Sequence, residues 1–298
     1  MVKLKKKVNV KRGVFIVGML SIAIANFLVF WLYVNFSSIM MAFTLPLDEA
    51  FTLENFARFF REVGRGGGVI LQALKNTLIF FASTMCVLLP LSVIFSYFLF
   101  KKVAGYKFYR VVFFLPSIIS SVVLATMYSQ MFSLNGPVNL LLEKLFGMDP
   151  VRFLRDSRYA LWTLVLYNVW SGFGSSLILF NGAMARIPED ILEYGKLDGV
   201  GFFREMFRVV VPLVWPTIST VIVLNTVGLF GAGAPILLFT EGKFDTYTIS
   251  YWIYEQVATL DGAKNYAAAV GIVFTLIGVP IVLVVKFLMG KVMEDVEF

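Results

Sequence analysis

Long apolar runs without charged residues recur along the whole chain, separated by short polar or basic segments. Each run is long enough to cross a bilayer as a helix, which takes about 20 residues. The runs lack the alternating segments of about ten residues that are typical of membrane barrels. The pattern therefore predicts an all-α, polytopic membrane protein with six transmembrane helices, at residues 14–34, 77–100, 111–134, 159–185, 209–235 and 265–285.

Composition and charge support this class and suggest an orientation. Hydrophobic residues make up 59% of the 298 residues, and a mean hydropathy of +0.82 is more than one soluble core of this size can hide. Segments 1–13, 101–110, 186–208 and 286–298 hold 16 of the 26 Lys and Arg residues. The positive-inside rule then predicts a multi-pass membrane protein with both termini cytoplasmic, and explains the net charge of +7 without nucleic acid.

The residues that are missing exclude several kinds of chemistry. The chain has no histidine and one cysteine, Cys86, so we expect no disulfide and no metal site. The predicted spans carry no ionisable residue in their cores, which disfavours coupling to an ion gradient, and they offer no catalytic group. The phosphate-binding pattern G-x-x-x-x-G-K-[S/T] is also absent. If ATP drives the protein, ATP and Mg bind to a partner subunit, and this chain is a noncatalytic protein without cofactors of its own.

The segment between the fourth and fifth predicted spans has the features of an amphipathic helix. Pro188 and the acids Glu189 and Asp190 are typical of a first helical turn, and Gly199 is expected to end the helix. Apolar residues at helical spacing make this loop too hydrophobic to remain in water. The pattern alone leaves two alternatives, a helix that docks on a partner and a helix that lies in the lipid interface.

The same loop resembles the signature of ABC importer permeases, E-A-A-x-x-x-G-x9-I-x-L-P. The matching positions are Glu193, Tyr194, Gly195, Gly199, Val209, Val211 and Pro212. Tyr194 and Gly195 depart from the two alanines of the motif, and a glycine inside a helix costs about 1 kcal/mol relative to alanine. Asp198-Gly199 and Phe113-Phe-Leu-Pro116 are similar to the carbohydrate branch, and the likeness extends over 53–288.

The resemblance is to the first permease subunit of maltose and glycerol-phosphate systems, which implies the type I ABC importer permease fold. It predicts a basic segment, first helix and external loop at 1–70, a transmembrane domain at 71–288 with a coupling helix near 188–203, and a cytoplasmic tail at 289–298. The implied partners are a second homologous permease, two ATP-binding subunits, an extracytoplasmic solute-binding protein, membrane lipid and a sugar or oligosaccharide. The ATPase-docking residues implied are Glu193, Tyr194, Gly195, Asp198 and Gly199.

Polar residues in the spans are candidates for contact with the transported solute. Asn168 and Ser171 are three residues apart and therefore share one helix face. By resemblance, the sugar site is lined by Asn168, Ser171, Gly172, Asn225 and Leu229. The alternative is structural, because Asn, Ser and Gly between transmembrane helices often serve in packing and interhelical hydrogen bonds. Gly228, Gly231 and Gly233 suggest either an unwound end of the fifth span or close packing.

Two other classes of function compete with a permease. A secondary transporter or channel would act without an ATPase, and would have no use for the loop at 186–208. A membrane-embedded enzyme or scaffold would move no solute across reconstituted vesicles. Replacing Glu193 and Gly199 separates the first of these from the permease, which would lose ATP-dependent uptake.

Overall fold

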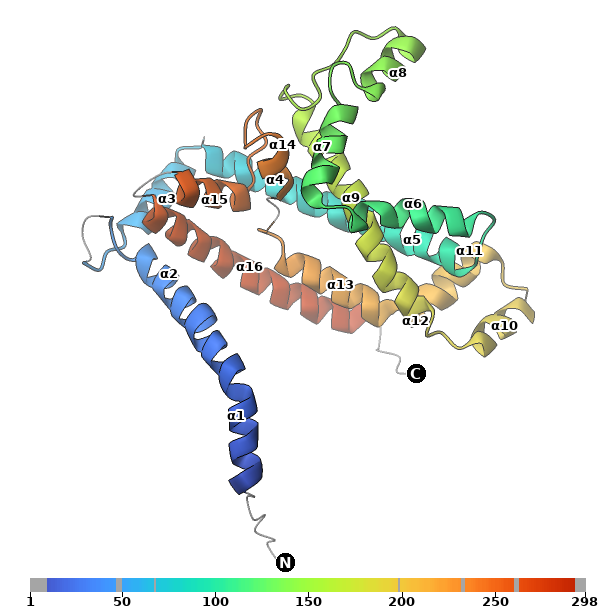
Figure 1. Cartoon of the computed structure of the whole chain (residues 1–298), viewed down its shortest axis with the longest axis horizontal. Helices are drawn as coiled ribbons and strands as arrows, with labels where there is room; N and C mark the ends of the chain where they lie inside the picture. Colours follow the sequence, from blue (N-terminus) through green and yellow to red (C-terminus); the bar gives the residue numbers. More distant parts are fainter. Residues whose placement is uncertain are drawn as a thin grey trace, which may run out of the picture.

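The computed structural model describes residues 10–46, 50–66, 68–197, 199–231, 234–259 and 263–292 (Figure 1). Its secondary-structure elements are helices, which confirms the predicted all-α class. The shorter helices beside the long spans are α3 (Glu54–Gly64), α8 (Pro137–Phe146), α10 (Glu189–Leu197), α14 (Ala234–Phe239) and α15 (Ile249–Thr259). The remaining helices form the spans, and three short π-helical stretches, labelled η, interrupt them.

Among the described residues, four helices are long and apolar enough to cross a membrane, and up to six crossings result if each of two bent helix pairs is one span. The four are Gly13–Ala42 (α1 Val10–Asn26, η1 Phe27–Tyr33, α2 Val34–Ala42), Val69–Phe100 (α4 Val69–Ser83, η2 Thr84–Leu88, α5 Leu89–Phe100), Ala160–Met184 (α9) and Lys264–Val292 (α16). The bent pairs are α6 (Tyr106–Ile118) with α7 (Ser121–Met131), and Phe202–Leu213 with α13 (Trp215–Val227). The predicted third and fifth spans are therefore broken, by 110° and 70°.

Two of the π-helical stretches are explained by prolines. Pro90 follows η2 by two residues, and Pro212 follows η3 (Met206–Val210) by two residues within α12 (Val211–Leu213). A proline ring clashes with the carbonyl group four residues earlier, and a wider turn moves that group away. The amides just after these stretches accordingly donate to carbonyl groups five residues back, Leu89 to Thr84 and Val211 to Met206.

The largest buried cluster lies where α5, α9 and the segment α10–α13 meet. It contains Tyr97 from α5, Phe180 and Met184 from α9, and Met206 and Val210 from η3. A second cluster joins α3, the start of α4, α15 and α16. These two clusters lie near opposite ends of the long helix pair α4–α5 (Figure 1). Two smaller clusters among the described residues lie along α9, one with α4, α14 and α15 and one with α7.

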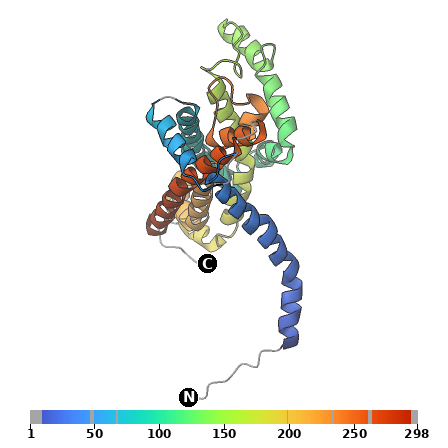
Figure 2. The same ribbon diagram turned by 90° about the vertical axis from the view of Figure 1, so that its left-hand side faces the viewer.

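The first span lies apart from the rest of the chain along most of its length (Figures 1 and 2). None of the residues in its most apolar window of 18 is buried. Its large side chains, Phe15, Ile22 and Phe30 among them, are exposed. Because apolar surface of this extent is not stable in water, we expect lipid or another membrane helix to cover it.

One end of the bundle, called here the α3 end, comprises α3, α15 and the first turns of α4 and α16. Asparagine side chains connect its segments. Asn55 donates to the carbonyl groups of Ala42 and Thr44, and Asn265 donates to those of Met41 and Thr44. Asn76 bridges α4 to the carbonyl groups of Asp245 and Tyr247, each at 2.8 Å.

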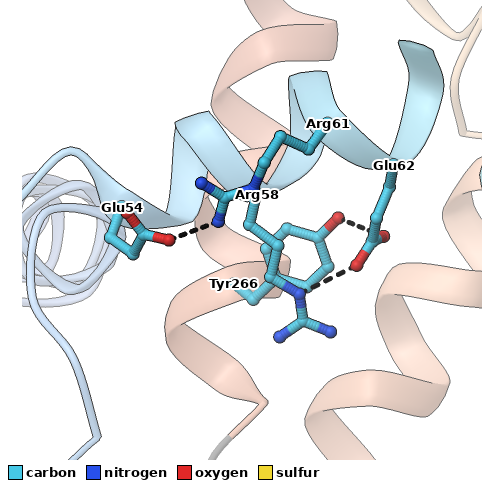
Figure 3. Close-up of polar contacts among 5 residues, drawn as sticks. All are labelled: Glu54, Arg58, Arg61, Glu62 and Tyr266. Atoms are coloured by element: carbon cyan, nitrogen blue, oxygen red, sulfur yellow. Dashed lines mark hydrogen bonds and ion pairs between the residues drawn. The ribbon is translucent and has the colours of Figure 1, made fainter. Parts of the chain in front are cut away.

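A charged network on α3 completes this end (Figure 3). Glu62 accepts hydrogen bonds from the Tyr266 hydroxyl at 2.6 Å and from Arg58 Nε at 2.8 Å. The Arg58 guanidinium lies 4.0 Å from the centroid of the Tyr266 ring. Arg61 pairs with Glu54 on the solvent side of the same helix. These contacts fasten α3 to the start of α16.

Candidate functional site

The predicted loop helix is present as α10, and local sequence explains both of its ends. Glu189 and Asp190 lie in the first turn, where the helix dipole favours acids. The helix ends at Leu197, and Gly199 has a left-handed φ of +69°. The Val200 amide donates to the Gly195 carbonyl group five residues earlier, a pattern typical of helices terminated by glycine. Within the segment near 188–203, where the sequence predicts a coupling helix, the described residues form α10 and α11 (Phe202–Glu205).

One side of α10 is anchored to the transmembrane core. Leu192 is only 8% exposed and packs in the same buried cluster as Phe180 and Met184 of α9. Ile187, just before the helix, is buried in this cluster as well. The anchoring holds α10 against the ends of α5 and α9, at what is called here the α10 end of the bundle (Figure 1).

The opposite side of α10 has no partner among the described residues. Tyr194 is 67% exposed and Leu197 is 82% exposed, three residues apart on one helix face. Glu193 is exposed and borders an open cavity of about 600 Å³ that also touches Lys102 and Arg110. A short helix that is fixed on one side and apolar on the other can bind a second surface without rearranging.

The glycines of the motif differ in what they contribute. A Cβ atom on Gly195 would meet nothing within 4 Å, so packing inside this chain does not require a glycine there. Gly199 also has open space around it, but its left-handed backbone favours glycine. Asp198, the remaining predicted docking residue, lies outside the described residues.

The polar residues predicted to line a solute site come partly together. A cavity of about 250 Å³ lies between η2, α9 and the end of α13. Three of the residues proposed from sequence for the solute site, Asn168, Asn225 and Leu229, line this cavity. The other lining residues are Phe80, Phe81, Thr84, Leu224, Gly228 and Gly231.

The two amides hold different positions in this cavity. Asn168 Nδ2 donates to Thr84 Oγ1 at 3.2 Å and so joins α9 to η2. Asn225 Nδ2 donates to the Val221 carbonyl group of its own helix at 2.9 Å. Both side chains are partly exposed, and their carboxamide oxygens can accept from a hydroxyl group. The site therefore offers amide and hydroxyl groups beside aromatic rings, which suits a polyhydroxylated solute.

The other predicted solute residues serve different roles in the structure. Ser171 is partly buried and does not line the cavity. A Cβ atom on Gly172 would lie 3.0 Å from Leu88 Cδ2, so this glycine allows close packing of α9 against η2. Leu229 is only 4% exposed and contributes mainly to packing behind the cavity.

Sequence reasoning missed Thr84 and the aromatic residues Phe80 and Phe81. Thr84 had a signal, because it lies six residues before Pro90 in an otherwise apolar run. π-Helical turns are often found at functional sites. The glycines after α13 fit the predicted unwound end, since α13 stops at Val227 and the Gly231 amide donates to Gly228 in a turn. Gly233 lies outside the described residues.

Comparisons with known proteins agree with this architecture. Residues 88–294 match the family described as the binding-protein-dependent transport system inner membrane component. The "Probable ABC transporter permease protein YesP" of Bacillus subtilis (strain 168) is 30% identical over 71% of this chain and 66% of its own length. The "Lactose transport system permease protein LacF" of Rhizobium radiobacter is 29% identical over 70% of this chain and 72% of its own length.

The fold also matches a solved structure. A chain of a bacterial alginate ABC transporter, crystallised in complex with an alginate pentasaccharide-bound periplasmic protein, superposes with a TM-score of 0.85. The match covers 96% of this chain and 98% of that chain at 23% sequence identity, and it therefore bears on the fold alone. The predicted type I importer permease fold is confirmed. Since the family match spans more than half of the sequence, the chain belongs to the family of inner membrane components of binding-protein-dependent transport systems, as a membrane-spanning permease subunit.

Proposed function

We propose that this chain is the permease subunit of an ATP-driven importer that carries a sugar or short oligosaccharide by alternating access. The observation that carries the proposal is α10, which is anchored by Leu192 and exposes Tyr194 and Leu197 beside Glu193. ATP and Mg bind to separate ATP-binding subunits, whose closure pushes on α10. Only a difference in binding between the two permease states can transmit that work.

The docking surface for the ATP-binding subunit comprises Glu193, Tyr194, Gly195 and Gly199, with Asp198 beside them in sequence. The lipid-interface alternative for α10 is less well supported, because Glu193 lies beside the exposed Tyr194 and Leu197 and would enter the bilayer with them. A protein surface can offer this face both apolar contacts and a hydrogen-bonding partner.

A sugar is the favoured solute because two of the relatives are named for sugars and because the cavity offers groups that can bind hydroxyl groups. LacF is named for lactose, and AraP of Halalkalibacterium halodurans for arabinooligosaccharides. The cavity around Asn168 and Asn225 has about 250 Å³, slightly less than the roughly 300–1,000 Å³ of ordinary ligand pockets. This chain would then supply one wall of the solute site, and a second permease the other.

The assembly proposed contains two permeases, two ATP-binding subunits and an extracytoplasmic solute-binding protein in the cytoplasmic membrane. The α10 end faces the cytoplasm together with both termini, and the α3 end faces outward. In this assignment, residues 71–288 form the transmembrane domain that carries out transport. Residues 1–70 form the basic segment, the first span and an external loop, and residues 289–298 form the cytoplasmic tail. The basic turn after α5, with Lys101 and Lys102, fits this orientation.

Replacing Glu193 and Gly199 together tests the proposal. The Glu193→Ala/Gly199→Val variant should lose co-purification of the ATP-binding subunit and ATP-dependent uptake, while remaining folded. Lys243→Ala, on an exposed loop at the α3 end, is the control and should change neither. Uptake that persists in the double variant would indicate a secondary carrier. Absence of solute movement with the unaltered chain would indicate a scaffold or an enzyme.

A further inference from the structure

An ion pair is buried near the docking helix α10, and none of the proposed docking residues takes part in it. Lys101, in the turn that follows α5, pairs with Glu205, the last residue of α11. The Glu205 side chain is only 5% exposed and that of Lys101 18%. The other ion pairs of the described residues lie on α3 and in the loop between α14 and α15, with every side chain at least 38% exposed. The buried pair is therefore the exception.

Aromatic contacts reinforce the same connection. The Tyr97 hydroxyl donates to the Phe202 carbonyl group at 3.0 Å. The Phe202 ring lies 4.8 Å from the Tyr97 ring and 5.5 Å from the Phe98 ring, measured between centroids. Lys101 Nζ lies 5.8 Å from the Tyr97 ring centroid. The Tyr97–Phe202 and Phe98–Phe202 contacts join the last turn of α5 to α11, the helix that follows α10, and the Lys101–Tyr97 contact lies within the end of α5.

A buried ion pair resists separation more strongly than an exposed pair. If the end of α5 moved away from α11, Glu205 would remain as a buried charge without its partner, which is strongly unfavourable. An exposed pair such as Lys243–Glu241 can separate into water at little cost. The end of α5 and α11 should therefore move together when α10 is pushed.

The helix that ends at this pair also reaches the solute cavity. Val69–Phe100 is one continuous helical span that includes the π-helical turn η2, and Thr84 in this turn lines the cavity and accepts from Asn168. At 1.5 Å per residue, Thr84 lies about 25 Å along the helix from Lys101. A second route from the loop runs through α12 and α13 to Asn225, but it bends by 70°. Two routes thus connect the docking loop to the same cavity.

We propose that the Lys101–Glu205 pair is a positioning element that makes the helix Val69–Phe100 follow the docking loop, so that ATP binding changes the cavity wall at Thr84. Lys101 and Glu205 contact neither the solute nor ATP. They act through the helix, as a rigid connection between two sites whose states must agree. The inference rests on the proposed function, because it requires an ATP-binding subunit at α10.

The test follows the two routes separately with single thiols in the complete complex in lipid. With Cys86→Ala as background, Thr84→Cys reports the first route and Asn225→Cys the second. The probe is a membrane-impermeant thiol reagent, and the measurement is the change in labelling rate when ATP and Mg are added. In the parent complex we expect a change of about threefold or more at both positions. Adding Glu205→Gln should abolish the change for Thr84→Cys and retain it for Asn225→Cys.

A second variant tests whether lower stability explains the effect of Glu205→Gln. Lys101→Met/Glu205→Gln removes both charges, so no lone charge is buried and the melting temperature should recover relative to Glu205→Gln alone. The response of Thr84→Cys should stay lost. Glu241→Gln/Lys243→Met removes an exposed pair and should leave both responses intact.

Three results decide the matter. A response of Thr84→Cys that survives Glu205→Gln, or that returns with stability in the double variant, overturns the proposal. If Glu205→Gln abolishes the ATP-dependent change in labelling at both thiols, the proposal is also overturned. The ion pair would then stabilise the whole docking loop and not one of the two routes. No ATP response in the parent complex is a separate outcome, and it would mean that the proposed function itself has failed.

Discussion

The two ends of the bundle differ in which polar groups they pair and which apolar groups they leave exposed. At the α3 end, Asn55, Asn76 and Asn265 direct their amides to backbone groups of distant segments, and charged residues pair with one another. At the α10 end, the charged pair is buried, whereas Tyr194 and Leu197 remain exposed. The contacts at the α3 end fasten segments of this chain to one another, whereas under the proposed function the exposed face of α10 binds a partner. The comparison thus distinguishes residues that hold the fold from residues that we propose to transmit work.

The largest expected effect concerns the exposed face of α10. Tyr194→Ser/Leu197→Ser should weaken association with the ATP-binding subunit by at least about thirtyfold, because buried aromatic and aliphatic anchors dominate interfaces. The melting temperature should stay unchanged, since neither side chain packs within the chain. The measurement is binding of the ATP-binding subunit to the permease in nanodiscs. Leu140→Ser/Leu141→Ser on α8 changes another exposed apolar pair and should have no effect on binding.

The opposite behaviour is expected for Asn76 at the α3 end. Asn76→Leu keeps the number and branching of the side-chain heavy atoms but leaves the Asp245 and Tyr247 carbonyl groups without their donor. We expect the free energy of unfolding to fall by about 2 kcal/mol, measured as a lower melting temperature in detergent. Asn35→Leu is the control, because Asn35 is exposed and donates only within its own helix. Similar losses in both variants would contradict a bracing role for Asn76.

A smaller effect is expected in the cavity that lies between the two ends. Asn225→Ala removes an amide that can hydrogen-bond a sugar hydroxyl group, so KM for uptake should rise about fivefold, as expected for about 1 kcal/mol. The maximal rate should change little. Asn181→Ala is matched, since Asn181 also donates to its own helix but lies outside this cavity. If both variants raise KM equally, the cavity around Asn225 is not the solute site.

Sequence reasoning succeeded where a local pattern determines the structure. The termination of α10 before Gly199 follows from helix-capping preferences, and the spans follow from hydropathy. It failed where the outcome depends on which helices meet. The burial of Glu205 is invisible in the sequence, because it requires the turn after α5 to reach α11. Thr84 and Asn168 are 84 residues apart, and only packing brings them together.

The bends and breaks in the spans are only partly predictable from the sequence. Pro90, Pro116 and Pro212 are visible in the sequence, but the backbone geometry that each imposes is not. Pro90 gives a π-helical turn within a continuous helix, whereas the helix that contains Pro116 ends two residues later, before a bend of 110°. Neighbouring helices determine whether a proline leaves the helix continuous or is followed by a bend. They either cover the carbonyl group that the proline leaves without a donor or leave room for the chain to turn.

The smallest expected effect is a pH dependence at the α3 end. Burial acts to raise the pKa of Glu62, but hydrogen bonds from Tyr266 and Arg58 outweigh it and hold the pKa below its ordinary value. A carboxylate with a depressed pKa contributes stability above its unfolded-state pKa, and this contribution is lost as the pH falls through the folded-state pKa. Between about pH 5 and pH 3, the melting temperature should therefore fall more for the unaltered chain than for Glu62→Gln. The difference should be small because the carboxylate is partly exposed to solvent. An equal fall in both proteins would show that the contacts of Glu62 in Figure 3 do not stabilise the α3 end.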